Sequence, residues 1–246
     1  MPFLTGGYPS LAVTTDAIGA VAQAGASIIE VGIPFSDPIA DGPVISASMH
    51  EALAAGATVE GVFRAVAQAR AHTDVGLVAM VSASIVTRIG AHDFVSRAAH
   101  AGFDGLIVPD LDSAGAGELA NLCESRGLSL ALLVAPTSSN ERSREIVSHC
   151  RGFVYLLARA GITGERDASP EIAGPVAALR AVTRLPIAAG FGISTAAHVA
   201  AVTQHADAAI VGSALVRRMG STTPVEAAAE FTSLLAAGLR APVRRN

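Results

Sequence analysis

The chain has no lysine, so all 17 of its basic residues are arginine. A Schiff base needs a lysine amine and a Walker-type phosphate loop needs its lysine, so both kinds of chemistry are excluded. Cysteine is nearly as scarce: Cys123 and Cys150 lie far apart without partners at metal-ligand spacing, which favours a reduced, cytoplasmic setting. The seven histidines are scattered too. We therefore expect no metal site, no Ser-His-Asp arrangement and no cofactor.

Charge of either sign is also sparse. Only 15% of the residues are charged and the net charge is −4, which argues against a nucleic-acid partner. No apolar run approaches the ~20 residues that span a bilayer, so no membrane association is expected. The start of the chain lacks the basic region and long apolar core of a signal peptide. With 51% hydrophobic residues, the composition readily supplies a large buried core.

Short apolar runs alternate with helical patterns along the whole chain. Strands are expected over residues 3–5, 27–32, 75–81, 105–108, 128–134, 153–157, 185–188 and 208–211. Helices are expected over residues 14–24, 46–55, 59–71, 92–100, 116–126, 141–150, 170–182, 195–204 and 224–237. Eight strands alternating with helices predict a (β/α)8 TIM barrel, an α/β fold that takes about 250 residues. No linker divides the chain, so a single domain over residues 1–246 is expected. A doubly wound sheet is disfavoured, because Gly6-Gly7 is not the glycine fingerprint that such a sheet needs after its first strand.

Glu30 stands out because it lies inside an apolar run that is typical of a buried strand. A buried carboxylate costs several kcal/mol unless it is paired or its pKa shifts. Strand alternation places Ile28, Glu30 and Gly32 on one face. Asp37 and Asp41 follow on a proline-rich loop, so an acid on the strand and one on the loop are predicted to face one cavity. The alternatives are a structural ion pair for Glu30 and turn roles for the two aspartates.

Two glycine loops fall where a barrel of this kind often binds phosphate, after the seventh and eighth strands. They read G-F-G-I-S over residues 190–194 and G-S-A over residues 212–214. Small residues directly before a helix leave backbone N–H groups free to hold an anion, so we expect a phosphate site there, with plain turns as the alternative. Gly164, after the sixth strand, is a candidate third contact. His198 and His205, seven residues apart on one helical stretch, are expected on a solvated face.

The segment from Glu30 to Pro43, E-V-G-I-P-F-S-D-P-I-A-D-G-P, resembles the signature of the tryptophan synthase alpha subunit family. The resemblance continues through Y-L-L-A-R-A-G-I-T-G over residues 155–164 and through both glycine loops. It covers almost the whole chain, in order. It implies a lyase that splits indole-3-glycerol phosphate into indole and glyceraldehyde 3-phosphate.

The resemblance also implies residue roles. Glu30 matches the family's general acid/base, which protonates C3 of the indole ring and takes the proton of the neighbouring glycerol hydroxyl. Asp41 matches the acid that hydrogen-bonds the indole N–H, and Tyr155 matches a tyrosine of the substrate pocket. Thr163 matches a loop threonine linked to closure over the substrate. The phosphate-binding loops are matched by Gly164, Phe191, Gly192, Gly212 and Ser213.

The chain departs from the family pattern in three places. Family members usually begin with a further helix, whereas this sequence starts almost on its first strand. In the loop after the third strand the family commonly has a Tyr and an Asn-Pro pair, whereas residues 80–86 of this chain read M-V-S-A-S-I-V and carry Ser82 and Ser84. After the fourth strand, Asp112 stands where a proline is usual. In the family these two loops help to contact the beta subunit. Three versions therefore stay open: an alpha subunit working with a beta subunit, a stand-alone lyase that releases free indole, and a catalytically silent barrel that only binds a beta subunit.

Overall fold

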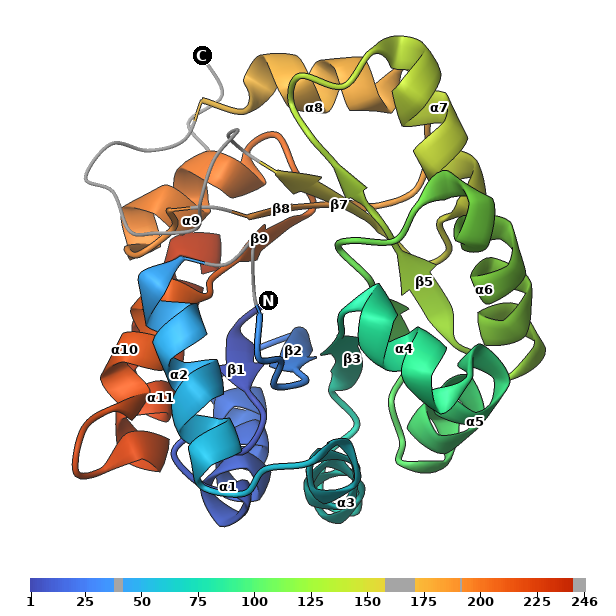
Figure 1. Ribbon diagram of the computed structural model, residues 1–246. Coiled ribbons are helices and arrows are strands. Elements are labelled where there is room, and N and C mark those ends of the chain that lie inside the picture. Colours follow the sequence, from blue (N-terminus) through green and yellow to red (C-terminus); the bar gives the residue numbers. More distant parts are fainter. Residues whose placement is uncertain (38–41, 158–170, 191, 241–246) are drawn as a thin grey trace.

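The structure, a computed structural model, describes residues 1–37, 42–157, 171–190 and 192–240, and its strands form a closed barrel (Figure 1). Within these residues the strands are β1 (Phe3–Thr5), β2 (Ile28–Gly32), β3 (Gly76–Met80), β4 (Gly105–Ile107), β5 (Ser129–Ala131), β6 (Leu133–Val134), β7 (Val154–Leu157), β8 (Ile187–Gly190) and β9 (Ala208–Ile210). All pairings are parallel, in the orders β1-β2-β3-β4-β5 and β6-β7-β8-β9. A bridge between Pro2 and Val211 joins β9 to β1. The expected (β/α)8 barrel is therefore confirmed.

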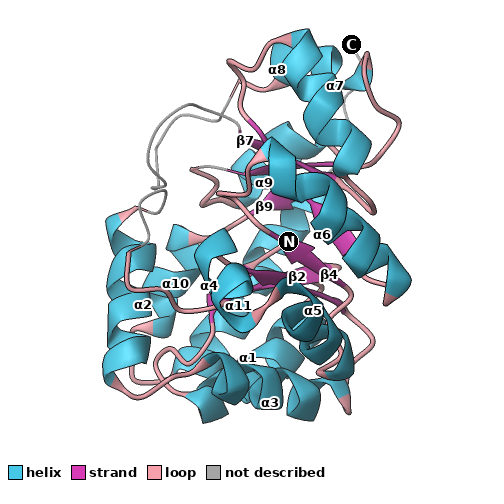
Figure 2. Cartoon of the chain, turned by 45° about the vertical axis from the view of Figure 1, so that its right-hand side comes forward, coloured by secondary structure: helices cyan, strands magenta, loops and turns pink. Residues whose placement is uncertain are grey.

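Helices surround the strands on the outside (Figures 1 and 2). They are α1 (Leu11–Gln23), α2 (Pro43–Ala54), α3 (Val59–Arg70), α4 (Ala83–Ile89), α5 (Ala91–His100), α6 (Ser113–Ser125), α7 (Asn140–His149), α8 (Ala173–Arg180), α9 (Ala196–Thr203), α10 (Ser213–Met219), α11 (Pro224–Ala236) and the short η1 (Ala237–Arg240). Among the described residues, no helix combines the length and the apolar character that crossing a membrane requires.

The fifth barrel strand differs from its expected form. A single strand over residues 128–134 is predicted from the sequence, but two segments, β5 and β6, flank Leu132. β5 pairs with β4 and β6 pairs with β7, so together they fill one position of the barrel. The short helix α4 was not expected, because it occupies a stretch that the sequence pattern leaves as a loop. A helix after residues 212–214 was assumed for the phosphate site but given no range, and α10 is that helix.

Three helices begin three residues before the positions that hydrophobic periodicity indicates. α1 begins after Ser10, whose hydroxyl accepts the N–H of Val13 at 3.2 Å. α6 begins after Asp112, whose carboxylate accepts the N–H of Gly115 at 2.8 Å. α2 begins at Pro43, whose fixed φ suits a first helical position. Side-chain caps mark the starts of α1 and α6, and the fixed φ of a proline favours the start of α2.

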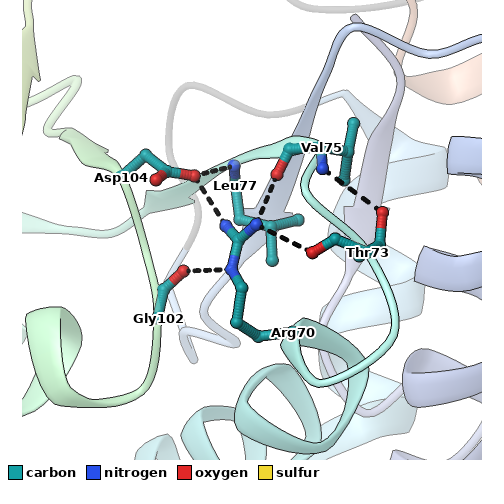
Figure 3. Close-up of polar contacts among 6 residues, drawn as sticks. All are labelled: Arg70, Thr73, Val75, Leu77, Gly102 and Asp104. Carbon is teal, nitrogen blue, oxygen red and sulfur yellow. Dashed lines mark hydrogen bonds and ion pairs between the residues drawn. The ribbon is translucent and has the colours of Figure 1, made fainter.

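An arginine clamp ties the amino-terminal ends of β3 and β4 together (Figure 3). The guanidinium of Arg70, in the last turn of α3, donates to three backbone oxygens, those of Gly102, Thr73 and Val75, at 2.8, 3.2 and 2.7 Å. It also donates to Asp104 Oδ2 at 2.6 Å, and the same oxygen accepts the N–H of Leu77 at 2.7 Å. Gly102 has φ +89°, and a Cβ there would lie 2.8 Å from Arg70 Cγ, so only glycine leaves room for the clamp.

The same arrangement recurs on the opposite side of the barrel, between β8 and β9. Arg180, in the last turn of α8, donates to the backbone oxygen of Leu185 at 3.2 Å and to Asp207. Asp207 Oδ2 accepts the N–H of Ile187 at 2.7 Å. Partial burial opposes ionisation of Asp207, but this N–H and the arginine outweigh it and hold its pKa below the usual value. The first clamp begins with the sequence R-A-H-T (residues 70–73) and the second with R-A-V-T (residues 180–183). The two halves of the barrel therefore contain the same kind of clamp.

Candidate active site

Glu30 lies in the interior of the barrel, on the face predicted from strand alternation. Its strand neighbour Ile28 belongs to the interior cluster, whereas Ile29 and Val31 belong to the core between strands and helices. The Glu30 side chain is 0% exposed, and neither carboxylate oxygen has a hydrogen-bond partner among the described residues. Burial therefore raises the pKa of Glu30 from 4.5 to about 8. The salt bridges found among the described residues do not include Glu30, but the positive charge of the buried Met1 amino group opposes part of this rise in pKa, so that group is the one candidate partner for the structural ion-pair alternative in this part of the chain.

Phe3 is a component of the site that sequence reasoning missed. It pairs in register with Glu30, and its ring covers Gly32, the next residue on the interior face of β2. A Cβ at Gly32 would lie 2.5 Å from Phe3 Cζ, so glycine is required there to admit the ring. The signal in the sequence is weak, because Phe3 looks like any apolar residue of a short strand.

Tyr155 lies in the barrel interior, as the resemblance implies for a pocket residue. It is buried in the cluster that contains Val78, the register neighbour of Glu30. A Cβ at Gly190, the last residue of β8, would lie 2.7 Å from the Tyr155 hydroxyl oxygen. Gly190 therefore leaves space for the tyrosine side chain at the carboxyl end of the barrel.

The two glycine loops lie at the carboxyl ends of β8 and β9. Gly192 has φ +71°, a backbone conformation that favours glycine. Gly212 directly precedes α10, and among the described residues no side chain caps the start of that helix. Ser213 is buried as its first residue. A Cβ at Gly212 would lie 3.3 Å from Ile45 Cδ1 of α2, so the loop is closely packed from one side.

His198 contradicts the expectation of a solvated face. Its side chain is buried in α9, only 7% exposed, because the helix turns this residue towards the barrel. Its Nδ1 accepts the backbone N–H of Ser194 at 3.4 Å, which ties the first glycine loop to α9. His205 lies beyond the helix and is exposed, as expected.

The loop after β2 is anchored by α2. His50 Nε2 lies 3.1 Å from the backbone oxygen of Ser36. Deeper in the protein, the hydroxyls of Thr5 and Ser48 lie 2.7 Å apart, and both residues are buried. These contacts fix α2 against β1 and the loop that leads from Glu30. Asp37 is exposed on this loop.

Several predicted site residues lie outside the described residues: Asp41, Thr163, Gly164 and Phe191. Their expected roles stay predictions. Of the altered loop residues, Ser82 caps α4 and accepts the N–H of Ser84 at 3.3 Å, while Asp112 caps α6.

The sequence and the fold both match known proteins along nearly their whole length. A family model described as tryptophan synthase alpha chain matches residues 1–239. The tryptophan synthase alpha chain of Synechococcus sp. (strain CC9902) is 43% identical over 232 residues, covering 94% of this chain and 86% of the relative. That of Halorhodospira halophila is 45% identical over 222 residues, covering 89% and 81%.

Solved structures give the same result. A Mycobacterium tuberculosis tryptophan synthase structure superposes with a TM-score of 0.90 at 36% identity, covering 97% of this chain and 91% of the other. The tryptophan synthase A-subunit of Pyrococcus furiosus superposes with a TM-score of 0.89 at 32% identity, covering 96% of both. Together with the buried glutamate and the glycine loops in their barrel, these matches show that the chain belongs to the tryptophan synthase alpha chain family.

Proposed function

We propose that this chain cleaves indole-3-glycerol phosphate to indole and glyceraldehyde 3-phosphate, as the alpha chain of a tryptophan synthase in tryptophan biosynthesis. The observation that carries the proposal is Glu30, a fully buried carboxyl group in the interior of a barrel of this family. Neither carboxylate oxygen has a hydrogen-bond partner among the described residues, and the attraction of the Met1 amino group does not offset the cost of its burial. A group that moves a proton to and from the substrate explains it.

The reaction is a retro-aldol cleavage, which needs an electron sink. The chain has no lysine to form a Schiff base, so the substrate must supply the sink. Protonated Glu30 gives its proton to C3 of the indole ring, and positive charge develops on the ring nitrogen. The Glu30 carboxylate then takes the proton of the glycerol hydroxyl next to the breaking bond. The carbon–carbon bond breaks, its electrons restore the indole, and the hydroxyl carbon becomes the aldehyde of glyceraldehyde 3-phosphate.

The pKa of Glu30 suits both halves of this cycle. At about 8, it keeps most of the carboxyl protonated at neutral pH, ready to act as an acid. Once it has lost the proton, the same burial makes the carboxylate a stronger base than an exposed one. In this proposal Asp41 hydrogen-bonds the indole N–H, Tyr155 lines the pocket, and Thr163 belongs to the closing loop. The phosphate is held by the glycine loops, through Gly164, Phe191, Gly192, Gly212 and Ser213.

The partner in this proposal is a tryptophan synthase beta subunit. In this version the alpha chain passes indole to the beta subunit. In the competing version the chain is a stand-alone lyase that releases free indole. The loops after β3 and β4, which carry Ser82, Ser84 and Asp112, are where the two versions differ. The assay is indole release from indole-3-glycerol phosphate by the purified chain, first alone and then with a beta subunit. Strong acceleration by the partner supports the alpha-chain version, whereas fast release that is unchanged by the partner supports the stand-alone version.

The proton-transfer role is tested in the same assay with Glu30→Gln. The glutamine amide has nearly the same shape as the carboxyl group but cannot donate and take back a proton near neutral pH. Turnover should therefore fall to the background rate. The matched control is Glu118→Gln, which changes an exposed carboxylate on α6 and should release indole at the wild-type rate. Turnover retained by Glu30→Gln removes Glu30 from the reaction. If the wild-type chain releases no indole, either alone or with the beta subunit, the proposed substrate is wrong. The remaining alternative is then the catalytically silent barrel.

A further inference from the structure

An acidic residue that the proposed reaction does not use joins two loops at the carboxyl end of the barrel. Asp110 follows β4, and both of its carboxylate oxygens contact the loop after β3. Oδ2 accepts the hydroxyl of Ser82 at 2.7 Å, and Oδ1 accepts the backbone N–H of Ala83 at 2.8 Å. We call this set of three residues the Asp110 bridge. Hydrogen bonds to an ionised carboxylate are stronger than those between neutral groups.

The bridge fixes the orientation of the Ser82 hydroxyl. A carboxylate can only accept, so the Ser82 hydrogen points to Asp110. The Ser82 oxygen is then available to accept, and it takes the N–H of Ser84 at 3.3 Å as the cap of α4. Just below, the N–H of Val81 donates to the oxygen of Ile107 at 2.9 Å, which extends the β3–β4 ladder to the base of the bridge. The two loops therefore form one connected wall.

Ser82 continues the interior column of β3. Val78 is the register neighbour of Glu30, and Met80 contacts the same interior cluster. The backbone of Ser82 is extended, with φ −68° and ψ 139°, so strand alternation places it next on that face. The column Val78, Met80 and Ser82 rises from the level of Glu30 to the rim.

The position of this wall indicates which end of the substrate it meets, and this step rests on the proposed function. β3 and β4 lie four barrel positions from β8 and β9, whose glycine loops are the proposed phosphate site. A substrate with its phosphate at those loops and its reacting carbon at Glu30 therefore directs its ring towards β3 and β4. We propose that Asp110 is a positioning residue for the ring end of the substrate, because it holds Ser82 and the start of α4 in the wall that the indole ring meets.

The experiment compares two ligands that share a phosphate but differ in the ring. Indole-3-propanol phosphate carries the indole and cannot be cleaved, whereas glycerol 3-phosphate has no ring. Their dissociation constants are measured by calorimetry for the wild-type chain and for Asp110→Ala, Asp110→Asn and Ser82→Ala. Asp110→Ala should weaken the ring-bearing ligand by about five- to tenfold, as expected when hydrogen bonds to a charged group are lost, and leave glycerol 3-phosphate within about twofold.

The conservative variant separates positioning from general damage. In Asp110→Asn the amide oxygen can accept the N–H of Ala83 and the amide nitrogen can donate to Ser82, so its affinity should lie nearer the wild type. The matched control is Thr58→Ala, which removes the cap of α3, where Thr58 Oγ1 accepts the N–H of Gly61 at 3.0 Å. It should destabilise the fold without changing either affinity.

Amide hydrogen exchange at Ala83 tests the bridge without any ligand. Exchange should quicken in Asp110→Ala and stay slow in Thr58→Ala. Unchanged exchange at Ala83, or equal weakening of both ligands in Asp110→Ala, overturns the proposal. If the wild-type chain binds neither ligand, the proposed substrate fails and the ring-end assignment with it, while the exchange rates still decide whether Asp110 joins the two loops.

Discussion

Glu30→Gln is expected to stabilise the protein in a pH-dependent way, although it abolishes the proposed activity. In the unfolded chain Glu30 ionises near its ordinary pKa of 4.5, whereas in the folded chain it keeps its proton up to about 8. Between these values the folded state binds more protons than the unfolded state. The free energy of unfolding therefore falls as the pH rises from 4.5 to 8. Outside this range the contribution of Glu30 to it does not change with pH.

The size of the effect follows from the same two values. A tenfold change in an acid constant corresponds to about 1.4 kcal/mol, so raising the pKa of Glu30 from 4.5 to about 8 amounts to about 5 kcal/mol at and above pH 8. Relaxation and water entry reduce this figure, so it is an upper value. The amide that Glu30→Gln introduces brings its own cost of burial, but that cost does not depend on pH. The change with pH in the stability difference between the two proteins therefore reports the ionisation of Glu30 together with that of the Met1 amino group, whose pKa of about 6 Glu30 helps to raise.

Urea unfolding followed by far-ultraviolet circular dichroism, at about pH 5 to 8.5, measures this difference. The chain has no tryptophan, so fluorescence is a weaker probe. The advantage of Glu30→Gln should grow by several kcal/mol across the range, while Glu118→Gln, with its exposed carboxylate, should show a constant difference. A constant difference for Glu30→Gln as well would show that Glu30 ionises normally when folded, and would refute the argument from burial.

Three further predictions follow from the clamps and the proposed site. Arg70→Ala and Arg180→Ala should each lower the free energy of unfolding by about 2 kcal/mol, because each removes hydrogen bonds from a charged donor; urea unfolding measures this, and no loss would make the clamps incidental. Gly212→Val should raise the KM for indole-3-glycerol phosphate about tenfold by crowding the proposed phosphate loop, and an unchanged KM would displace that site. Asp41→Asn should lower kcat by a factor on the order of 10² to 10³ with little effect on KM, and an unchanged kcat would return Asp41 to a turn role.

The barrel and its buried glutamate could be predicted because both depend on local pattern. Alternation along β2 placed Ile28 and Glu30 on one face and Ile29 on the other, and the structure confirms that division. A carboxylate in an apolar run is an anomaly that needs no distant residue to detect.

The residues that surround the glutamate could not be predicted, because their roles depend on contacts between distant segments. The sequence places Gly32 on the Glu30 face of its strand and Gly190 in a predicted phosphate loop, but it does not show that each makes room for an aromatic side chain from another strand, Phe3 and Tyr155. His198 was placed on the surface by its spacing, but its burial depends on how α9 packs on the barrel.

The clamps at the amino-terminal ends of the strands and Glu30 in the barrel interior have opposite effects on stability. Substitutions at the two places should therefore change stability and activity in different ways. At the amino-terminal ends of the strands, the clamps of Arg70 and Arg180 satisfy charge with hydrogen bonds and contribute stability. In the interior, Glu30 is buried with no hydrogen-bond partner among the described residues, which costs stability at neutral and alkaline pH. A clamp variant should thus be less stable with its KM retained, and Glu30→Gln more stable with its turnover lost. The opposite signs follow from the partners of each charge: the partly exposed clamp charges have their hydrogen-bond partners in place, whereas the buried Glu30, in its proposed role, meets its reaction partner only when the substrate binds.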